Sequence, residues 1–405
     1  MRDIGLLVSL LSLASLALWR PWLGVLALAF FGFTQPHSYA DGFMRDFPVY
    51  WSLLGATLVG ALFTRERSLP PRDWRVAALL LFWLGMLLST YHALFPNYAW
   101  PRFEQVSAVL ASTVLILVLI DTRQKLFLLL ATIALAFALV TIKGGYWAVI
   151  YGFGDRVYGP PGSQYHDNNA FAVAAVMTIP LLLLWLRQSG NAWLQGLLGV
   201  IIALSVLAAL SSWSRGGLLA LGTMGLLLLL ASTRRMALGL VPLAVVALVA
   251  VFCFFPEQWL ERMQSIASYE TDGSAQGRLE VWQRGLGFIE RFPFFGTGFE
   301  SWTYGERFQD WHSAYIEVAV EQGLVGFTLW LSLILGSLAG LTKLAWRFGN
   351  APETAWIRDY SVTLRASIGA YCVGSAFLGI AYWDLLFHLI AAAILLQALA
   401  HQEAA

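Results

Sequence analysis

The stretch LAALSSWSRGGLLA, residues 207–220, places a single arginine between two long apolar runs. Arg215 follows the run 193–212 and precedes the run 216–232. A helix needs about 20 mostly apolar residues to cross the hydrocarbon core of a membrane, and both runs come close to that length. The sequence therefore predicts two membrane-spanning helices joined by a short turn, with a permanent cation at the end of one of them.

The composition agrees with a membrane protein. The chain has 405 residues, of which 59% are hydrophobic and only 12% are charged, and its mean hydropathy is +0.68. So few charged residues cannot cover the surface of a soluble protein of this size. We expect an all-α fold, a polytopic bundle of transmembrane helices. The net charge of +1 gives no electrostatic reason to expect a nucleic-acid partner.

Apolar runs of about the length of a membrane span recur along the whole chain. They are residues 47–64, 75–92, 103–120, 125–142, 169–186, 193–212, 216–232, 236–255, 323–342, 362–380 and 384–400. Residues 4–34 are also apolar but are interrupted at Arg20, so they form either one long kinked span or two short ones. One crossing gives twelve spans with the N-terminus inside, and two give thirteen with it outside. We expect about twelve.

Basic residues occur in alternate connectors between the predicted spans. They include Arg65, Arg67, Arg72, Arg75, Arg123, Lys125, Arg187, Arg234, Arg235, Lys343, Arg347, Arg358 and Arg365. The positive-inside tendency places these connectors in the cytoplasm and the others outside. The chain then divides into transmembrane helices with short loops over 1–255, a large outward loop over 256–322, and C-terminal transmembrane helices over 323–405.

The outward loop 256–322 is expected to be partly helical. A short helix starts at Pro256, and a helix follows over 278–292 with Leu279, Trp282, Leu286 and Ile289 as one apolar stripe. Proline and glycines end that helix, and a third helix over 312–323 stops at Gly323.

Arg215 has two readings. An interfacial arginine that holds a helix end is common in membrane proteins. The alternative is an anion site, because Gly216 and Gly217 carry no side chains and would let a ligand reach backbone N–H groups at a helix N-terminus. A guanidinium adds a permanent charge and a bidentate fork for phosphate oxygens. The spacing alone does not decide between the two.

Two further arginines are candidates in the outward loop. Arg278 lies in the expected first turn of its helix, directly after a glycine, and either a solvated face or an anion contact explains it. For Arg284, a solvated helix face is the better explanation from the residues alone.

Histidines supply the candidate bases. His312 stands at the start of the third outward helix, ahead of Glu317 and Glu321, which share one helix face. A lone histidine is usually structural, but His312 is the one side chain of this loop that acts as a base near neutral pH. His166, within SQYHDNN, could face the same site.

Some motifs are missing from the sequence. It has no D-x-D pair for a nucleotide sugar, no Walker A motif and no His/Cys cluster, so we expect neither a metal nor a cofactor. Cys253 and Cys372 lie in apolar runs and are expected to be buried and inert. An outward site with arginines and one base fits transfer from a lipid-linked diphosphate donor that has already crossed the membrane.

Three motifs, in this order, resemble the O-antigen ligase family of bacterial inner-membrane proteins. They are SSWSRGGLLAL (211–221), GRLEVWQRGLGFIERFPFFGTGFESW (277–302) and HSAYIEVAVEQGLVGF (312–327). In that family a Ser-Arg-Gly-Gly motif ends one span. An arginine and a Pro-x-x-Gly-x-Gly turn lie in a large periplasmic loop, and a histidine precedes a helix that ends in Glu-x-Gly. Ser313 departs from the family, which usually has asparagine after the histidine.

A fourth segment narrows the resemblance. VYGPPGSQYHDNNAFA (157–172), together with RDIGLL near the N-terminus, is more similar to the exosortase A-associated branch, the O-glycosylation ligases linked to exopolysaccharide loci.

The resemblance implies a metal-independent, inverting glycosyltransferase of the kind used in lipopolysaccharide biosynthesis. Its donor would be an undecaprenyl-diphosphate-linked glycan, its acceptor lipid A-core or a protein, and its active site would face the periplasm from the bacterial inner membrane. Arg215 and Arg278 would bind the diphosphate and stabilise it as leaving group, and His312 would deprotonate or orient the acceptor hydroxyl. The remaining expected substrate-binding residues are Arg284, Glu321 and His166.

Two alternatives stay open. A polysaccharide polymerase of the same superfamily would use the same donor but a second lipid-linked glycan as acceptor. A membrane transporter would need ionisable residues or broken helices near the midplane, whereas the predicted spans are nearly free of carboxylates.

Overall fold

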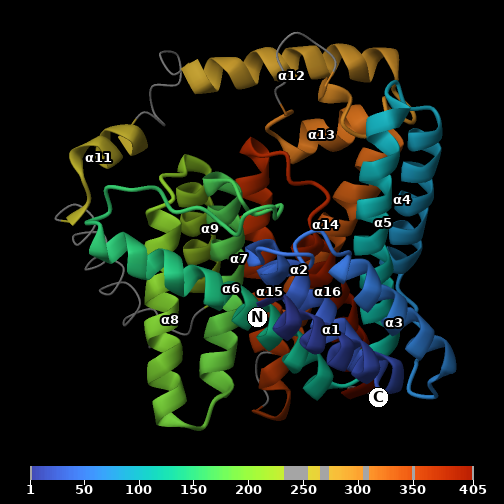
Figure 1. The fold of residues 1–405 in the computed structure, drawn as a ribbon, viewed down its shortest axis with the longest axis vertical. Coiled ribbons are helices and arrows are strands. Elements are labelled where there is room, and N and C mark those ends of the chain that lie inside the picture. Colours follow the sequence, from blue (N-terminus) through green and yellow to red (C-terminus); the bar gives the residue numbers. More distant parts are fainter. Residues whose placement is uncertain (1, 232–253, 265–272, 304–309, 349–351, 404–405) are drawn as a thin grey trace.

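The computed structural model describes residues 2–231, 254–264, 273–303, 310–348 and 352–403, and within them all regular secondary structure is helical (Figure 1). Up to residue 231 the elements are α1 (Arg2–Trp19), α2 (Pro21–Thr34), η1 (Pro36–Tyr39), α3 (Val49–Phe63), α4 (Trp74–Tyr91), α5 (Pro96–Leu119), α6 (Arg123–Ile150), α7 (Asn168–Gln188), α8 (Ala192–Leu210) and α9 (Arg215–Ala231). Then follow α11 (Glu257–Gln264), α12 (Gly273–Arg291), η3 (Ser301–Thr303), α13 (Ala314–Glu321), α14 (Gly323–Arg347), η4 (Pro352–Thr354), α15 (Ala355–Gly374), η5 (Ser375–Phe377) and α16 (Asp384–Glu403).

Eight of the described helices are long and apolar enough to cross a membrane, namely α1, α4, α5, α6, α7, α8, α14 and α16. The shorter helices α2, α3 and α9 are also apolar. Every predicted run within the described residues overlaps a helix, which confirms a polytopic helical bundle at this level. The run 236–255 lies almost wholly outside the described residues, so the total number of spans stays a prediction.

The N-terminal stretch 4–34 forms two helices that pack against each other and against α3. Near its start, Asp3 accepts a hydrogen bond from the Met44 backbone at 3.0 Å. At the turn between the helices, Arg20 contacts Glu66. The chain therefore folds back at Arg20. Residues 4–34 therefore form two helices and not one long kinked helix; the number of times that they cross the membrane stays a prediction.

Within the described residues, the basic connectors meet at one end of the bundle, which we call the arginine-rich end; Arg234 and Arg235 lie outside the described residues. The Arg123 guanidinium lies 4.8 Å from the centroid of the Trp356 ring, and Arg358 donates to the Ala231 carbonyl at 2.8 Å. Further contacts at this end join Ser68 with Val118, Lys125 with Trp22, and Tyr360 with Gln188. The connectors predicted to share a side thus lie together; the side of the membrane that they face stays a prediction.

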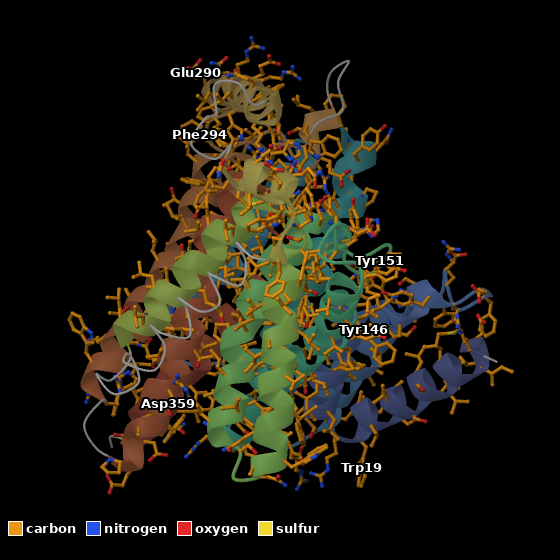
Figure 2. The ribbon with its side chains drawn as sticks, turned by 90° about the vertical axis from the view of Figure 1, so that its left-hand side faces the viewer. Trp19, Tyr146, Tyr151, Glu290, Phe294 and Asp359 are labelled. Carbon is orange, nitrogen blue, oxygen red and sulfur yellow. The ribbon has the colours of Figure 1, made fainter. Side chains whose placement is uncertain are left out.

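The outward loop covers the opposite end, which we call the α12 end. Helix α12 lies across the ends of the long helices, with α13 beneath it and α11 to one side (Figure 1). In Figure 2, Glu290 and Phe294 project at this end, whereas Trp19 and Asp359 lie toward the other. The three helices expected in 256–322 are therefore present as α11, α12 and α13.

Several predicted boundaries are wrong. Helix α6 continues to Ile150 instead of ending near residue 142, and α15 covers 355–374 instead of 362–380. Residues 375–383, which we call the 375–383 segment, leave the helix although they are apolar. Tertiary contacts hold the segment instead, because the Tyr371 hydroxyl donates to the Ile380 carbonyl at 3.0 Å.

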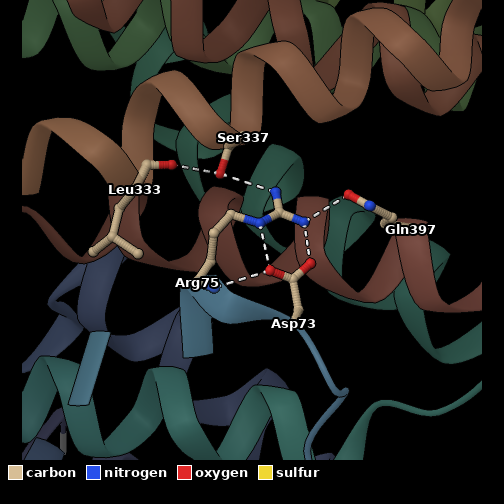
Figure 3. Close-up of polar contacts among 5 residues, drawn as sticks. All are labelled: Asp73, Arg75, Leu333, Ser337 and Gln397. Carbon is tan, nitrogen blue, oxygen red and sulfur yellow. Dashed lines mark hydrogen bonds and ion pairs between the residues drawn. The ribbon is translucent and has the colours of Figure 1, made fainter. Parts of the chain in front are cut away.

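A buried arginine ties three helices together near the arginine-rich end (Figure 3). Arg75 is 1% exposed and its Nη2 lies 2.5 Å from Asp73 Oδ2. The same guanidinium donates to Gln397 of α16 at 2.8 Å and to Ser337 of α14 at 3.3 Å. Each contact replaces water that the buried cation has lost, so α4, α14 and α16 are fixed relative to one another.

Removal of the carboxylate should therefore be costly. Asp73→Ala leaves the buried guanidinium without its counter-charge, which costs about 3–5 kcal/mol when one partner of a buried pair is deleted. The midpoint of thermal unfolding in detergent should drop well below that of the unchanged protein. Asp121→Ala is the control, because its ion pair with Lys125 is partly exposed and is worth about 0–1 kcal/mol. Equal effects of the two variants would contradict this account.

The orientation can be tested with single cysteines in a background in which Cys253 and Cys372 are alanine. Leu69, at the arginine-rich end, is 90% exposed, and Gln283 is exposed on α12. In intact cells a membrane-impermeant thiol reagent should label Gln283→Cys and spare Leu69→Cys. Permeabilised cells should label both. The opposite pattern would invert the predicted topology.

Candidate active site

The turn between α8 and α9 presents Arg215 as the first residue of α9. Asn168, at the start of α7, donates to the Ser212 carbonyl at 2.6 Å. From α11, Arg262 donates to the Trp213 carbonyl at 2.9 Å. Two other parts of the chain therefore hold the turn that precedes this arginine.

The two glycines after Arg215 have packing roles. A Cβ on Gly217 would lie 2.5 Å from the Ala172 Cβ, so close contact with α7 requires glycine there. Its N–H is also taken, because it donates to the Ser214 hydroxyl at 3.0 Å. A Cβ on Gly216 would make only ordinary contacts, with Phe377 and the Gly374 carbonyl oxygen, both at 3.9 Å. The expectation that both glycines leave the first turn open to a ligand is therefore wrong for Gly217.

Helix α12 is held on α13 by a small apolar cluster. It contains Val281, Trp311 and Val320, with Phe288, Ile289, Trp302 and Ile316 around them. At the closest approach, a Cβ on Gly285 would lie 2.8 Å from Ile316. Leu279 and Leu286 are 39% and 53% exposed. The predicted apolar stripe is therefore wrong at those two positions, because the face that contains Gly285 packs on α13.

The two candidate arginines of α12 have different surroundings. The helix begins at Gly273, so Arg278 lies in its second turn and not in the first turn as expected. Its side chain is half-buried. Arg284 is exposed, and within the described ranges it makes no hydrogen bond or ion pair. The solvated-face reading of Arg284 therefore agrees with its position.

The Pro-x-x-Gly-x-Gly turn packs closely on the end of α13 and is hydrogen-bonded to it. Gly296 and Gly298 have φ of 72° and 83°, a region that favours glycine. Between them, the Thr297 N–H donates to the Val320 carbonyl at 2.9 Å, and the Gly298 N–H donates to the Glu321 carbonyl at 3.0 Å. A Cβ on Gly296 would lie 2.5 Å from the Glu321 carbonyl. The motif thus fixes the last turn of α13.

Two carboxylates of α13 are buried at this junction, with Glu321 2% and Glu317 7% exposed. Glu321 accepts from the Glu300 N–H at 2.8 Å and from the Tyr382 hydroxyl at 3.0 Å. Glu317 accepts from the Ala381 N–H at 3.0 Å. The predicted pairing on one helix face is confirmed, but the pair faces inward.

Burial governs the protonation of this pair. It raises the pKa of Glu321 to about 8, against the hydrogen bond from Tyr382 and the charge of Arg102. It also raises the pKa of Glu317 well above its usual value, and the charge of Glu321 adds to that rise. Near neutral pH the protonated acids are therefore favoured.

His312 lies in the connector before α13 with φ of 49°, a left-handed conformation that is uncommon outside glycine. Burial lowers the pKa of His312; Asp310 opposes that shift, Arg278 adds to it and Asp167 opposes it. Three charged side chains from separate segments therefore lie within electrostatic reach of the ring. The lowered pKa keeps the imidazole neutral near pH 7, which is the form that accepts a proton.

The 375–383 segment connects the parts of this site. A Cβ on Gly379 would lie 2.3 Å from Asp310 Oδ2, so the carboxylate sits directly against the glycine backbone. Two residues later the Ala381 N–H and the Tyr382 hydroxyl donate to the buried glutamates. The start of this segment also touches the first turn of α9. It therefore runs from Arg215 past Asp310 to the acid pair.

His166 lies elsewhere, in a cavity of about 1070 Å³ that we call the α2–α6 groove. Lys143 and Arg156 line the same groove, and the Arg156 guanidinium lies 5.9 Å from the centroid of the Trp213 ring. The apolar lining includes Phe30, Leu139, Val140 and Trp147. Figure 2 shows Tyr146 and Tyr151 projecting from this end of α6. His166 itself is exposed, and its neighbour Asp167 is the residue that acts on His312.

Residues with strained backbone conformations also cluster at the α12 end. Among the described residues, positive φ outside glycine occurs at Gln35, Phe153, Trp213, Glu300 and His312. All five belong to connectors at the α12 end. Such conformations cost free energy and persist where surrounding contacts impose them, often at functional sites.

The structure brings Arg278 and His312 together, links Arg215 to them through the 375–383 segment, and leaves Arg284 on the surface. Sequence reasoning missed Asp310, Arg102 and Tyr382. Asp310 carried a visible signal, because it lies two residues before the candidate base. The other two gave none, because each lies within or beside an apolar run.

The comparisons with known proteins match two parts of the chain. Residues 200–331 match the family model for O-antigen ligase. This match supports placement in the O-antigen ligase superfamily and contains every candidate residue except His166. Residues 1–191 match a family of unknown function (DUF5935). No curated protein matches the chain. Together with the apolar helices, the ligase match indicates a multi-pass membrane protein with a glycosyltransferase-like role.

Proposed function

We propose that this protein is an O-antigen ligase-like glycosyltransferase of the bacterial inner membrane. It transfers a glycan from an undecaprenyl-diphosphate donor to an acceptor, lipid A-core or protein, on the periplasmic side. The observation that carries this proposal is the position of His312, a neutral base within electrostatic reach of Arg278, inside the region that matches the ligase family. The α12 end is then the periplasmic end.

Each candidate residue has a role in this reaction. Arg215 and Arg278 bind the diphosphate and stabilise the charge that it gains as it leaves. His312 accepts the proton of the acceptor hydroxyl while that oxygen attacks the sugar carbon opposite the diphosphate, so the configuration inverts. Asp310 stands beside the ring to stabilise the imidazolium that results.

The α2–α6 groove supports a lipid carrier as donor. It combines an apolar wall with Lys143, Arg156 and His166, which is the pairing of surfaces that an isoprenoid diphosphate needs. Exposed aromatic side chains such as Trp147 and Tyr158 surround it, as is typical of the membrane headgroup level. In this account His166 contacts the donor lipid and not the acceptor.

The first test asks whether Arg215 acts through its planar, bidentate guanidinium or only through its positive charge. Arg215→Lys keeps the charge but loses the bidentate fork, so we expect a loss of transfer almost as large as in Arg215→Ala, about 10²- to 10³-fold. The assay uses purified protein in liposomes with lipid-linked glycan. Arg291→Lys, on the exposed face of α12, is the matched control. Near-normal transfer by Arg215→Lys would reduce Arg215 to an interfacial anchor.

The second test concerns His312. A positioned base contributes about 10²- to 10⁴-fold, so His312→Ala should bind donor yet transfer very slowly. The pH profile tests the role further. The positive charge of Arg278 lowers the pKa of His312. In Arg278→Gln the acid limb of the rate profile should therefore move to higher pH, in addition to the loss of rate.

Two controls distinguish a His312 that accepts a proton from a His312 whose ring only positions the substrate. His312→Gln should recover part of the activity only if the ring merely orients the hydroxyl. Among the described residues no three His, Cys, Asp or Glu side chains gather in a potential metal site. Chelator should therefore leave transfer unchanged. An unmoved acid limb in Arg278→Gln, or full activity of His312→Ala, would remove His312 from the reaction.

A further inference from the structure

A second, more polar cavity adjoins the acid pair. It measures about 460 Å³, within the roughly 300–1,000 Å³ typical of small-molecule sites. We call it the Asp384 cavity. Its walls come from α2, α3, α5, residues 162–164 and the start of α16. Tyr382 lines it and at the same time donates to Glu321, so the cavity lies directly against the candidate active site.

Asp384 is the first residue of α16, a position that favours a carboxylate, but this carboxylate is buried. It is 3% exposed, and a buried charge of this kind is costly unless it is well hydrogen-bonded. Tyr165 donates from its hydroxyl, Gln164 donates at 2.8 Å and the Leu385 N–H at 2.8 Å, all to Oδ1. Within the described parts of the chain Oδ2 makes no hydrogen bond. Oδ1 of Asp384 is thus held by three hydrogen bonds, whereas Oδ2 of this cavity-lining residue has none.

Two further polar atoms of the lining are buried without a partner. His37 Nδ1 makes no hydrogen bond with the described residues, and neither does the Tyr50 hydroxyl, which lies beside Ser112 without hydrogen-bond geometry. A buried polar atom without a partner is unfavourable and is normally matched by water or a ligand. All three residues line the Asp384 cavity, and hydroxyl groups of a bound ligand would match such atoms.

We propose that the Asp384 cavity binds one sugar ring of a substrate glycan. This inference rests on the proposed transfer reaction. A carboxylate oxygen, an imidazole and a phenol match the hydroxyls of a sugar, and Phe31 and Trp51 offer apolar surface to its C–H face.

The charges argue against other ligands. Arg102 and Asp384 both line the cavity, so a phosphate would face a buried carboxylate and a cation would face a guanidinium. A neutral polyhydroxyl ligand avoids both repulsions. The ring can come from the donor glycan or from the acceptor glycan, since the chemistry of binding is the same.

Binding can be measured without turnover. Methyl glycosides of glucose, mannose and N-acetylglucosamine are added to the full-length protein in lipid nanodiscs, and saturation-transfer NMR records which of them bind. Tyr50→Phe and His37→Ala should each weaken the bound glycoside about three- to tenfold, as expected for one lost hydrogen bond. Tyr360→Phe, which removes a hydroxyl bonded to Gln188, is the matched control and should have no effect.

A second measurement identifies the source of the ring. It compares the affinity for undecaprenyl diphosphate with that for undecaprenyl diphosphate carrying one N-acetylglucosamine. If the sugar adds affinity and Tyr50→Phe removes that gain, the ring belongs to the donor. If Tyr50→Phe weakens glycoside binding but leaves the gain unchanged, the ring belongs to the acceptor.

Two results would overturn the inference. Either no methyl glycoside binds the unchanged protein, or glycosides bind equally well to Tyr50→Phe, His37→Ala and the control. The cavity would then hold water only. Transfer by the unchanged protein is measured in the same preparation. Transfer without glycoside binding would contradict the sugar subsite and leave the proposed function standing. Glycoside binding without transfer would support the subsite and contradict the proposed function.

Discussion

Burial of two carboxylates at the end of α13 is the constraint on which the candidate site depends. Glu317 and Glu321 are almost fully removed from solvent, so each needs donors that replace water. Those donors come from segments far apart in the chain, the turn at Glu300 and the residues Ala381 and Tyr382. Satisfying the acids therefore fixes the outward loop and the connector before α16 against one another.

That arrangement also sets the electrostatics of His312. Its neighbours Arg278, Asp310 and Asp167 belong to α12, to the connector before α13 and to the start of α7. Burial is the largest influence on the pKa of His312, ahead of these charges, and it favours the neutral imidazole. A base that stays neutral beside an arginine can accept a proton while the arginine holds an anion. The proposed reaction needs the base and the arginine near each other, and this packing places them within electrostatic reach.

Much of the fold could be predicted from the sequence, because a run of about 20 apolar residues has few alternatives to a helix. For the turns that the structure describes, the alternation of basic connectors predicted which of them meet at one end of the bundle. The hairpin at Arg20 was left open, since an arginine before a proline fits both a kink and a turn. The stripe through Leu279 and Leu286 was wrong because Gly285, which periodicity does not count, makes the closest contact.

The candidate site was predicted from charged residues that stand out in the sequence. Arg215 interrupts apolar sequence, Arg278 follows a glycine in the outward loop and His312 precedes two glutamates; their roles stay a prediction. The 375–383 segment was missed because its composition resembles the helix before it, and only the buried acids on another helix explain why it unwinds. A backbone N–H that serves a carboxylate cannot also serve its own helix. Hydrophobic pattern therefore predicts where the chain enters the membrane, whereas the polar groups buried at the α12 end determine where the helices must stop.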